Sequence, residues 1–329
     1  MGLLSGKRIL MVAPRFFGYE RDIQEELTRQ GAVVDWLPDR PFDTPIMSAL
    51  TKIQPNLIFP AADRLYMQLL GKFAADHYNI ILVINGQTLS SQTLLRLRGT
   101  FPTAIFVLYM WDSIANRKHT LKNLSFFDKV FTFDPRDAVN YQLILRPLFY
   151  GHQFDMMAAH NQSFKYKISF VGTSHSDRFK IIDRLRASLP RGVDCFWYLY
   201  LQAPWVLQYY RLTKPGMMHA KMSDFNFTPI DKRNLKSVFS DSLSILDIEH
   251  PLQVGLTMRT FETLGANKKL ITTNQSIRDY DFFTSNNICV IDRNKPLLPT
   301  NFFDSPFTPL PPSIRERYSI TGWLSELIS

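Results

Sequence analysis

Arg259 and Glu262 lie one helical turn apart in the most informative stretch of the chain, residues 244–274. The spacing of apolar residues over 257–266 predicts a helix, which follows a strand-like run and a polar loop. The first N–H groups of a helix have no partner within it and carry the positive end of the peptide dipoles. The corner before this helix is therefore a candidate seat for an anion. It consists of Gly255, Leu256 and Thr257.

The two charged residue types suit a nucleotide. An arginine in the first turn opposes the helix dipole, so Arg259 is a poor choice for helix stability and a good one where phosphate binds. A carboxylate one turn later, Glu262, can accept hydrogen bonds from ribose hydroxyls. An ordinary ion pair at i,i+3 explains the same spacing. The residues alone leave both interpretations open.

The same stretch resembles the donor-site motif of bacterial GT-B glycosyltransferases. More narrowly, it is similar to the spore-maturation-type and lipopolysaccharide-biosynthesis branch of the "group 1" transferases. The resemblance is carried by Gln253, Gly255, Leu256, Thr257, Met258, Arg259, Thr260 and Glu262, followed by residues 268–272. It implies that the arginine and the helix N-terminus bind a diphosphate and that the glutamate binds the ribose. Relatives carry a second glutamate eight positions earlier, where this chain has the apolar Val254.

A second anion loop is expected at the start of the same domain. A loop with Gly172 and Thr173 joins a predicted strand to a helix and can cradle an anion, with Arg178 assisting. It resembles the FVG-plus-Arg opening of the family's nucleotide domain, and it lacks the G-x-x-x-x-G-K spacing of a Walker loop. Capping of the helix by Ser176 or Asp177 is the structural alternative, and it is compatible with binding.

Strand and helix patterns alternate through the first half of the chain, which predicts a doubly wound parallel-sheet domain. The predicted strands cover residues 7–14, 32–37, 57–59, 80–84, 103–110 and 129–133. The predicted helices cover residues 19–30, 45–52, 65–76 and 134–142.

Four residues of this half are assigned to the acceptor side, because open α/β sheets bind ligands outside the carboxyl ends of their strands. Gly18 and Tyr19 follow the first predicted strand, Asn85 follows another, and Asp112 follows the central apolar strand. Asp112 would line an inter-domain cleft, where a carboxylate can deprotonate an acceptor hydroxyl. Capping of the next helix is the alternative for Asp112, and a plain turn is the alternative for Gly18.

At 329 residues the chain has room for two domains. We expect an α/β protein with two Rossmann-like doubly wound parallel-sheet domains, the GT-B arrangement that the resemblance implies. The expected parts are an acceptor domain at 1–148, a linker at 149–166, a nucleotide-sugar donor domain at 167–295, a proline-rich tether at 296–312, and a C-terminal helix at 313–329 that crosses back onto the first domain.

Composition narrows the partners. The net charge of +9 attracts anions, and the chain shows no compact basic run or nucleic-acid module. Charge and composition thus favour phosphorylated substrates or an anionic membrane over nucleic acid. The resemblance implies, more narrowly, a nucleotide-sugar donor and a glycan or lipid-linked acceptor, with peripheral contact with the inner membrane. The lone Cys195 and Cys289 suit a reducing compartment. No apolar run reaches the ~20 residues of a membrane span and no signal cleavage region is present, so a cytoplasmic, peripherally membrane-associated protein is expected.

No cofactor and no metal are expected, because Arg259 and helix N-termini can stabilise a leaving diphosphate. The DxD sequence at 279–281 is interpreted as coincidental. Residues 195–210 contain seven aromatic side chains split by Pro204. These side chains either pack in the core or form a surface segment that meets membrane or acceptor lipid, and the sequence leaves both alternatives open.

The expected function is transfer of a sugar from a nucleotide-diphosphate sugar to a glycan or lipid-linked acceptor in bacterial cell-surface polysaccharide synthesis. A nucleotide-sugar epimerase of the same fold is the enzymatic alternative. A non-catalytic nucleotide- or glycan-binding module is the alternative of another class.

Overall fold

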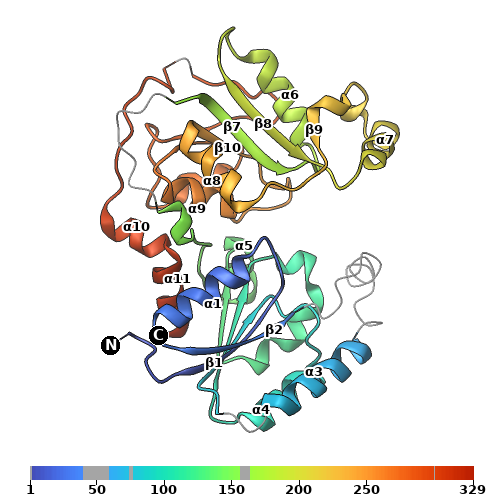
Figure 1. Ribbon diagram of the computed structural model, residues 1–329, viewed down its shortest axis with the longest axis vertical. Helices are drawn as coiled ribbons and strands as arrows, with labels where there is room; N and C mark the ends of the chain where they lie inside the picture. The colour runs from blue at the N-terminus through green and yellow to red at the C-terminus, as the bar shows by residue number, and fades with distance from the viewer. Residues whose placement is uncertain (1, 40–58, 74–76, 156–163, 300) are drawn as a thin grey trace. The chain divides into compact units, whose positions relative to one another are not determined.

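The chain divides into two compact units in a computed structural model that describes residues 2–39, 59–73, 77–155, 164–299 and 301–329 (Figure 1). The first unit comprises Met1–Leu148 and Ile320–Ser329, and the second comprises Phe149–Ser319. Each unit contains its own six-stranded parallel sheet with connecting helices. The predicted fold class, two doubly wound parallel-sheet α/β units, is confirmed.

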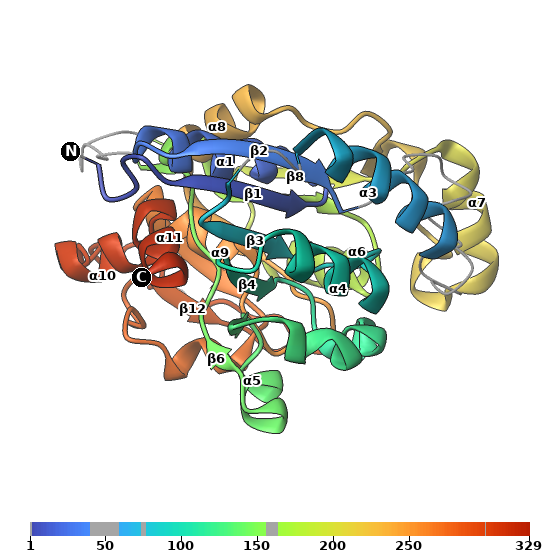
Figure 2. The ribbon, with the colours of Figure 1, turned by 90° about the horizontal axis from the view of Figure 1, so that it is seen from below.

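The sheet of the first unit has the strand order β2-β1-β3-β4-β5-β6 (Figure 2). Its central strands are apolar throughout, and all five residues of β3 are buried, because a parallel strand is covered on both faces. The strands are β1 (Arg8–Ala13), β2 (Val33–Pro38), β3 (Ile80–Ile84), β4 (Ile105–Met110), β5 (Lys129–Thr132) and β6 (Ile144–Leu145). The helices are α1 (Tyr19–Arg29), α3 (Phe59–Phe73), α4 (Ser91–Thr100), α5 (Pro135–Tyr141) and α11 (Ile320–Ile328).

One predicted strand of this half is wrong at its last residue. Phe59 begins α3, because the buried side chains of Phe59, Ala62, Tyr66 and Leu70 recur at helical spacing on one face. The first two residues of that predicted strand lie outside the described residues, and so does the predicted helix at 45–52.

The sheet of the second unit has the strand order β12-β11-β10-β7-β8-β9. The strands are β7 (Tyr166–Thr173), β8 (Cys195–Tyr200), β9 (Phe225–Asn226), β10 (Ser242–Asp247), β11 (Lys269–Thr272) and β12 (Ile288–Val290). The helices are α6 (Arg178–Ser188), α7 (Pro204–Thr213), α8 (Lys232–Asp241), α9 (Met258–Gly265) and α10 (Pro312–Tyr318). No helix in the described ranges is both long and apolar enough to cross a membrane.

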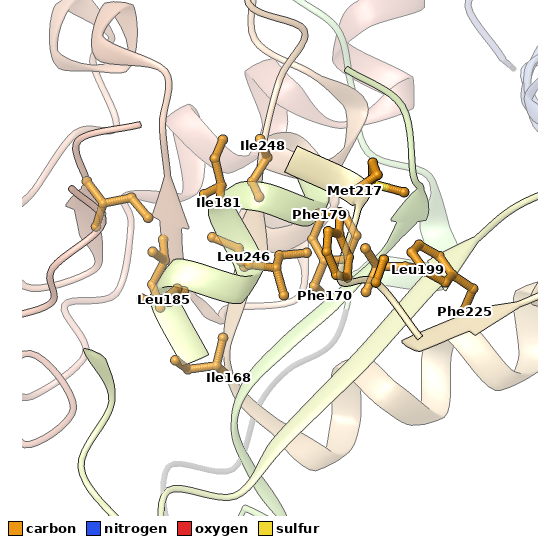
Figure 3. Packing of buried hydrophobic residues seen from close by; sticks show 14 of the residues in the cluster. Ile168, Phe170, Phe179, Ile181, Leu185, Leu199, Met217, Phe225, Leu246 and Ile248 are labelled. Carbon is orange, nitrogen blue, oxygen red and sulfur yellow. The ribbon is translucent and has the colours of Figure 1, made fainter. Parts of the chain in front are cut away.

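The core of the second unit lies between its central strands and α6. Phe170 of β7 and Leu246 of β10 meet Ile181 and Leu185 of α6, and all four side chains are at most 2% exposed (Figure 3). Burying each such side chain contributes roughly 1.5–3 kcal/mol relative to leaving it in water. This packing fixes where the carboxyl ends of β7 and β10 lie.

The segments predicted as linker and tether pack as parts of the second unit. Tyr150 donates its N–H to the Tyr318 carbonyl at 3.0 Å. A Cβ on Gly265 would lie 2.5 Å from the Tyr150 ring, so only glycine allows this approach. In the segment predicted as a tether, Phe302 is buried, and the Lys269 ammonium donates to the Phe302 carbonyl at 2.5 Å. In the described parts of both segments, buried side chains such as Tyr150 and Phe302 attach the chain to the second unit.

The single helix predicted at 313–329 is two helices. Ser319 has extended backbone angles, φ −69° and ψ 158°, and ends α10. The chain pairs there with Tyr150 in a parallel bridge, so the helical hydrogen bonds do not continue into α11. The division of the chain counts α10 with the second unit and α11 with the first.

Helix α11 packs into the core of the first unit. Trp323 is fully buried and packs edge to face against Tyr109, with ring centroids 4.8 Å apart. Thr321 donates its hydroxyl to the buried Glu26 carboxylate of α1 at 2.8 Å. Glu326 pairs with the fully buried Arg146 guanidinium at 2.8 Å. The last residues of the chain are therefore structural members of the first unit.

We predict that Trp323→Ala lowers the free energy of unfolding of the first unit by about 3–5 kcal/mol, because a fully buried ring leaves a cavity. Hydrogen exchange of β4 and β5 amides measures this loss. Trp205→Ala, which removes a tryptophan that is 70% exposed, serves as the matched control and should stay within about 0.5 kcal/mol of wild type. Equal effects of the two substitutions would refute the structural role of α11.

Candidate functional site

The second sheet reverses its winding direction between β7 and β10. From β7 the chain adds β8 and β9 on one side, and from β10 it adds β11 and β12 on the other. Open parallel sheets bind ligands outside the carboxyl ends of their strands at such a reversal. Most of the residues predicted to bind a donor lie at this edge of the sheet.

Arg178 joins the two strand ends at the reversal. Its Nε donates to the Ile248 carbonyl at 2.7 Å, and its Nη1 donates to the Thr173 carbonyl at 3.1 Å. Burial lowers the pKa of Arg178 to about 10, although the nearby Asp247 carboxylate favours the charge. A Cβ on Gly172 would lie 3.2 Å from the Arg178 Nη1, so the loop packs closely on the guanidinium. Arg178 organises the loop, and direct contact with an anion stays a prediction.

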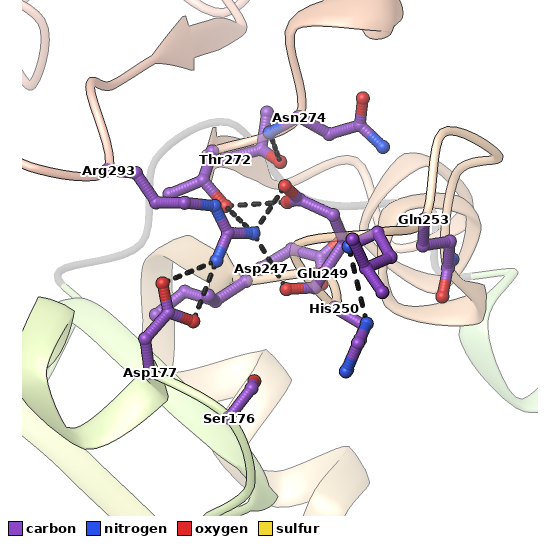
Figure 4. Close-up of polar contacts among 12 residues, drawn as sticks. Ser176, Asp177, Asp247, Glu249, His250, Gln253, Thr272, Asn274 and Arg293 are labelled. Carbon is purple, nitrogen blue, oxygen red and sulfur yellow. Dashed lines mark hydrogen bonds and ion pairs between the residues drawn. The ribbon is translucent and has the colours of Figure 1, made fainter.

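Arg293 links the loops that follow β7, β10 and β11 through Asp177, Glu249 and Thr273 (Figure 4). Its Nη1 donates to both carboxylate oxygens of Asp177, at 2.7 and 2.9 Å. Its Nη2 donates to the Glu249 carboxylate at 2.5 Å and to the Glu249 carbonyl at 2.8 Å. Burial disfavours the charge of Arg293, but the hydrogen bonds to Glu249 and Asp177 outweigh burial and raise its pKa. Thr273, after β11, donates to the same Glu249 carboxylate at 2.5 Å.

The N-terminus of α9 lies at this edge, and no side chain of the described residues caps it. Thr257 is the N-cap residue, but its hydroxyl donates to Asp247 at 2.7 Å, and no side-chain cap bond forms there in the described structure. Thr260 donates to the same Asp247 oxygen at 2.8 Å. Asp247 therefore binds the threonine hydroxyls of the first turn. The first backbone N–H groups of α9 are left without a capping side chain.

The loop before α9 is held by its carbonyl groups. Asn274 Nδ2 and Ser276 Oγ both donate to the Val254 carbonyl, at 3.0 and 2.8 Å. Gln253 Nε2 donates to the Gly255 carbonyl at 2.7 Å. Because the carbonyls of this loop are occupied, the backbone dipoles are fixed in one direction. A fixed loop of this kind is compatible with an anion at the N–H groups of the helix start.

Arg259 and Glu262 form the ion pair that their spacing allows. Arg259 Nη1 lies 2.6 Å from Glu262 Oε2, and the glutamate side chain is 2% exposed. Arg259 also reaches back to the Val171 carbonyl at 3.3 Å and lies over the Phe239 ring. The pair is thus partly buried against β7 and is not an ordinary surface pair. Diphosphate and ribose binding by these residues stay predictions. Met258, the first residue of α9, is partly exposed beside them.

Two histidines also lie at this edge. The rings of His175, after β7, and His250, after β10, have centroids 6.0 Å apart. Burial, together with the positive charge of Arg178, lowers the pKa of His175 to about 3. His175 is therefore a neutral hydrogen-bonding group near pH 7. Its imidazole contacts the Ser176 hydroxyl at 3.0 Å.

The described residues contain no group of three or more His, Cys, Asp or Glu side chains placed to hold a metal ion. The second aspartate of the DxD sequence, Asp281, accepts a hydrogen bond from the Tyr318 hydroxyl at 2.7 Å and pairs with Arg317 at 3.1 Å. These contacts give Asp281 a structural role in holding α10.

The residues predicted for the acceptor side lie at the carboxyl edge of the first sheet. Its winding reverses between β1 and β3, and Gly18 follows β1 with φ 79°, a conformation that favours glycine. Phe17 also has positive φ, 51°, and is 65% exposed. Tyr19 begins α1, with its ring 6.3 Å from that of Phe16. The strained turn exposes an aromatic cluster at this edge.

Asn85 and Asp112 are both engaged within the first unit. Asn85, 1% exposed, accepts the Trp111 N–H on its side-chain oxygen at 3.1 Å and thereby joins the ends of β3 and β4. Asp112 pairs with Arg117 at 2.8 Å and accepts from Asn116 Nδ2 at 3.0 Å. The Asp112 side chain is 29% exposed. A catalytic role for it stays a prediction.

The sequence interpretation missed several residues of the second edge. They are His175, Asp247, Glu249, His250, Asn274 and Arg293. Five of the six lie at the last residue of β7, β10 or β11 or within three residues after it, which is the signal that could have identified them. Arg293 has no such local signal, because the three-residue strand before it is too short for its periodicity to be recognised.

The chain has two Rossmann-like parallel-sheet units, and its C-terminal helix belongs to the first of them. This is the GT-B fold of nucleotide-sugar-dependent glycosyltransferases. No protein-family model and no curated protein matches the sequence. Solved structures do match over nearly the whole chain.

One match is a glycosyltransferase of Rickettsia africae, with 14% identity over 98% of this chain and 97% of that chain and a TM-score of 0.57. Another is Alr3699/HepE of Anabaena in complex with UDP and glucose, with 10% identity over 98% of both chains and a TM-score of 0.62. The same protein in complex with UDP-glucose gives a TM-score of 0.60. At these identities the likeness shows the shared fold, and the narrower branch expected from the sequence stays a prediction.

We predict that Arg293→Ala destabilises the second unit by about 3 kcal/mol, because it leaves the buried Glu249 carboxylate without its charged partner. Hydrogen exchange of β10 and β11 amides should quicken accordingly. Arg317→Ala is the control, since it breaks an ion pair whose side chains are 53% and 36% exposed, and exposed pairs contribute at most about 1 kcal/mol. Unchanged exchange in Arg293→Ala would show that the cluster does not hold this edge.

Proposed function

We propose that the protein transfers a sugar from a nucleotide-diphosphate sugar to a hydroxyl of a glycan or lipid-linked acceptor. The observation that carries the proposal is the uncapped N-terminus of α9 at the sheet reversal, beside the Arg259–Glu262 pair. The likeness of the whole chain to the UDP and UDP-glucose complexes of Anabaena HepE supports it. UDP is therefore the first nucleotide to test.

In this proposal the diphosphate binds at the leading N–H groups of α9, next to Gly255, Leu256 and Thr257. Arg259 reorients from Glu262 toward the phosphate oxygens, and Glu262 then accepts hydrogen bonds from the ribose. Positive charge fixed before the reaction stabilises the negative charge that develops on the leaving nucleotide. This electrostatic work is what a metal ion does in other transferases, so we propose metal-independent transfer.

On the acceptor side, Asp112 acts as the general base in this proposal. Its two oxygens contact Arg117 and Asn116, and each carboxylate oxygen retains a lone pair for an acceptor hydroxyl. Gly18, Tyr19 and Asn85 shape the same edge. We further propose a hexose as the transferred sugar and bacterial surface polysaccharide, of lipopolysaccharide or capsule type, as the product, as the sequence resemblance implies.

A panel of nucleotide-diphosphate sugars tests the reaction class. Incubation with UDP-glucose, UDP-galactose and UDP-N-acetylglucosamine should release UDP slowly by transfer to water and faster when a glycan acceptor is present. Conversion of one UDP-sugar into its epimer without release of UDP would overturn transfer in favour of epimerisation. Binding of UDP without any turnover of the panel would favour a non-catalytic module.

We predict that Arg259→Ala and Glu262→Ala each weaken UDP binding roughly 10- to 150-fold, because each removes a charged hydrogen-bonding group worth about 1.5–3 kcal/mol. Isothermal titration calorimetry measures the change. Arg233→Ala removes an exposed arginine from α8 of the same unit and should bind UDP like the wild type. Affinity unchanged in both site variants would refute the donor assignment.

We predict that Asp112→Asn lowers the rate of transfer by about 10²–10⁴, since the amide cannot accept the hydroxyl proton. The amide keeps the size of the side chain, so the UDP affinity should stay within about twofold of wild type. Rates of UDP release with saturating donor and acceptor give the measurement. Retained turnover would leave Asp112 with the purely structural role of pairing with Arg117.

A further inference from the structure

Helix α7 of the second unit presents an apolar face to solvent. Trp205 is 70% exposed, Tyr209 is 56% exposed and Leu212 is 88% exposed. Their spacing of four and three residues places the three side chains on one side of the helix. Val206 and Leu207, on the other side, are buried in the core. The core therefore holds α7 by one face and leaves three large apolar side chains uncovered.

The segment after α7 also carries exposed apolar side chains. Met218 is 65% exposed and Met222 is 41% exposed. Arg211 of α7 holds the segment in place, because its Nε and Nη2 donate to the Ala220 carbonyl at 3.0 and 2.5 Å. We call this set of exposed side chains the α7 surface. It comprises Trp205, Tyr209, Leu212, Met218 and Met222.

The stretch of chain that carries the α7 surface has basic side chains and no acidic ones up to Ser223. Residues 195–223 contain no aspartate or glutamate, whereas they contain Arg211, Lys214 and Lys221. The carboxylate that follows, Asp224, is engaged by Arg186 at 3.1 Å and by the Lys221 N–H at 2.8 Å. An apolar helix face on a segment with three cations and no carboxylate of its own is complementary to an anionic apolar layer.

We propose that the α7 surface docks the protein on an anionic lipid bilayer. Tryptophan and tyrosine favour the membrane interface, where the ring lies among acyl chains and its polar atom stays near water. An apolar helix face rimmed by basic residues binds in the plane of such an interface. Trp205, Tyr209 and Leu212 enter the boundary of headgroups and acyl chains, and Lys214 and Lys221 contact anionic headgroups. A protein partner with an apolar face offers no comparable reason for the missing carboxylates.

This docking is independent of the proposed reaction, because the α7 surface shares no residue with the candidate donor site. It is therefore tested without a nucleotide sugar or an acceptor. Failure of glycosyl transfer would leave it standing, and failure of docking would leave the donor site standing.

Co-sedimentation of the full-length protein with vesicles provides the test. The protein should sediment with vesicles of phosphatidylglycerol and phosphatidylethanolamine at 0.1 M salt, and at least tenfold less with pure phosphatidylcholine vesicles. Raising the salt to about 0.5 M should weaken the binding, because headgroup attraction is screened. Absence of binding to the anionic vesicles at 0.1 M salt overturns the proposal.

Variants assign the binding to the α7 surface. The triple substitution Trp205→Ser, Tyr209→Ser and Leu212→Ser should reduce the bound fraction at least tenfold, and Lys214→Gln with Lys221→Gln should reduce it several-fold. A control triple, Leu95→Ser, Val139→Ser and Leu297→Ser, removes apolar side chains that are 64%, 79% and 52% exposed elsewhere and should bind like the wild type. Equal loss in both triples, or none in the first, overturns the proposal.

A conservative variant guards against misfolding of the first triple. Lipids brominated on their acyl chains should quench part of the tryptophan fluorescence of the bound wild type. Trp205→Phe should bind the vesicles within about twofold of wild type and lose that quenching. Quenching that persists in Trp205→Phe places another tryptophan in the bilayer and overturns the proposal. Analytical ultracentrifugation tests the alternative that the α7 surface joins two copies of the chain. Concentration-dependent dimerisation that the first triple abolishes would also overturn the proposal.

Discussion

Two arginines hold the carboxyl edge of the second sheet together, and the candidate donor site depends on them. In a parallel sheet every strand ends at the same edge, so carbonyls and carboxylates accumulate there. Arg178 bridges the carbonyls that end β7 and follow β10, while Arg293 pairs with both Asp177 and Glu249. Charges that are this buried persist only when they are paired. The loops after β7 and β10 keep their geometry because Arg178 and Arg293 form hydrogen bonds with their carbonyl and carboxylate groups.

The orientation of the loop before α9 follows from the same constraint. Asp247 takes the hydroxyls of Thr257 and Thr260, and Asn274 takes the carbonyl of Val254. The bonds to Asp247 occupy both threonine hydroxyls, and the bond from Asn274 occupies a loop carbonyl. The first N–H groups of α9 are thereby left without a capping side chain. A preorganised positive site of this kind needs no rearrangement of the backbone when charge develops on a bound diphosphate.

The first unit depends on residues from the far end of the chain. Trp323 packs on Tyr109 of a central strand, and Glu326 provides the charged partner of the fully buried Arg146. Without α11, the unit would expose the apolar ring face and leave a guanidinium in its interior without this carboxylate. The C-terminal residues are consequently part of the same core as the N-terminal strands.

The sequence by itself determined the alternation of strands and helices, because periodicities of 2 and 3.6 residues are local properties. It also placed Arg259 and Glu262 one turn apart, and the pair forms. Tertiary structure alone decided the partners of Arg293, which are 116 and 44 residues away in the chain. It also decided the break at Ser319, since the apolar pattern continues across that residue and only the pairing with Tyr150 interrupts the helix. The exposure of Trp205 was likewise decided by tertiary structure. Helix α7 has apolar residues on both faces, so its sequence does not determine which face the core covers.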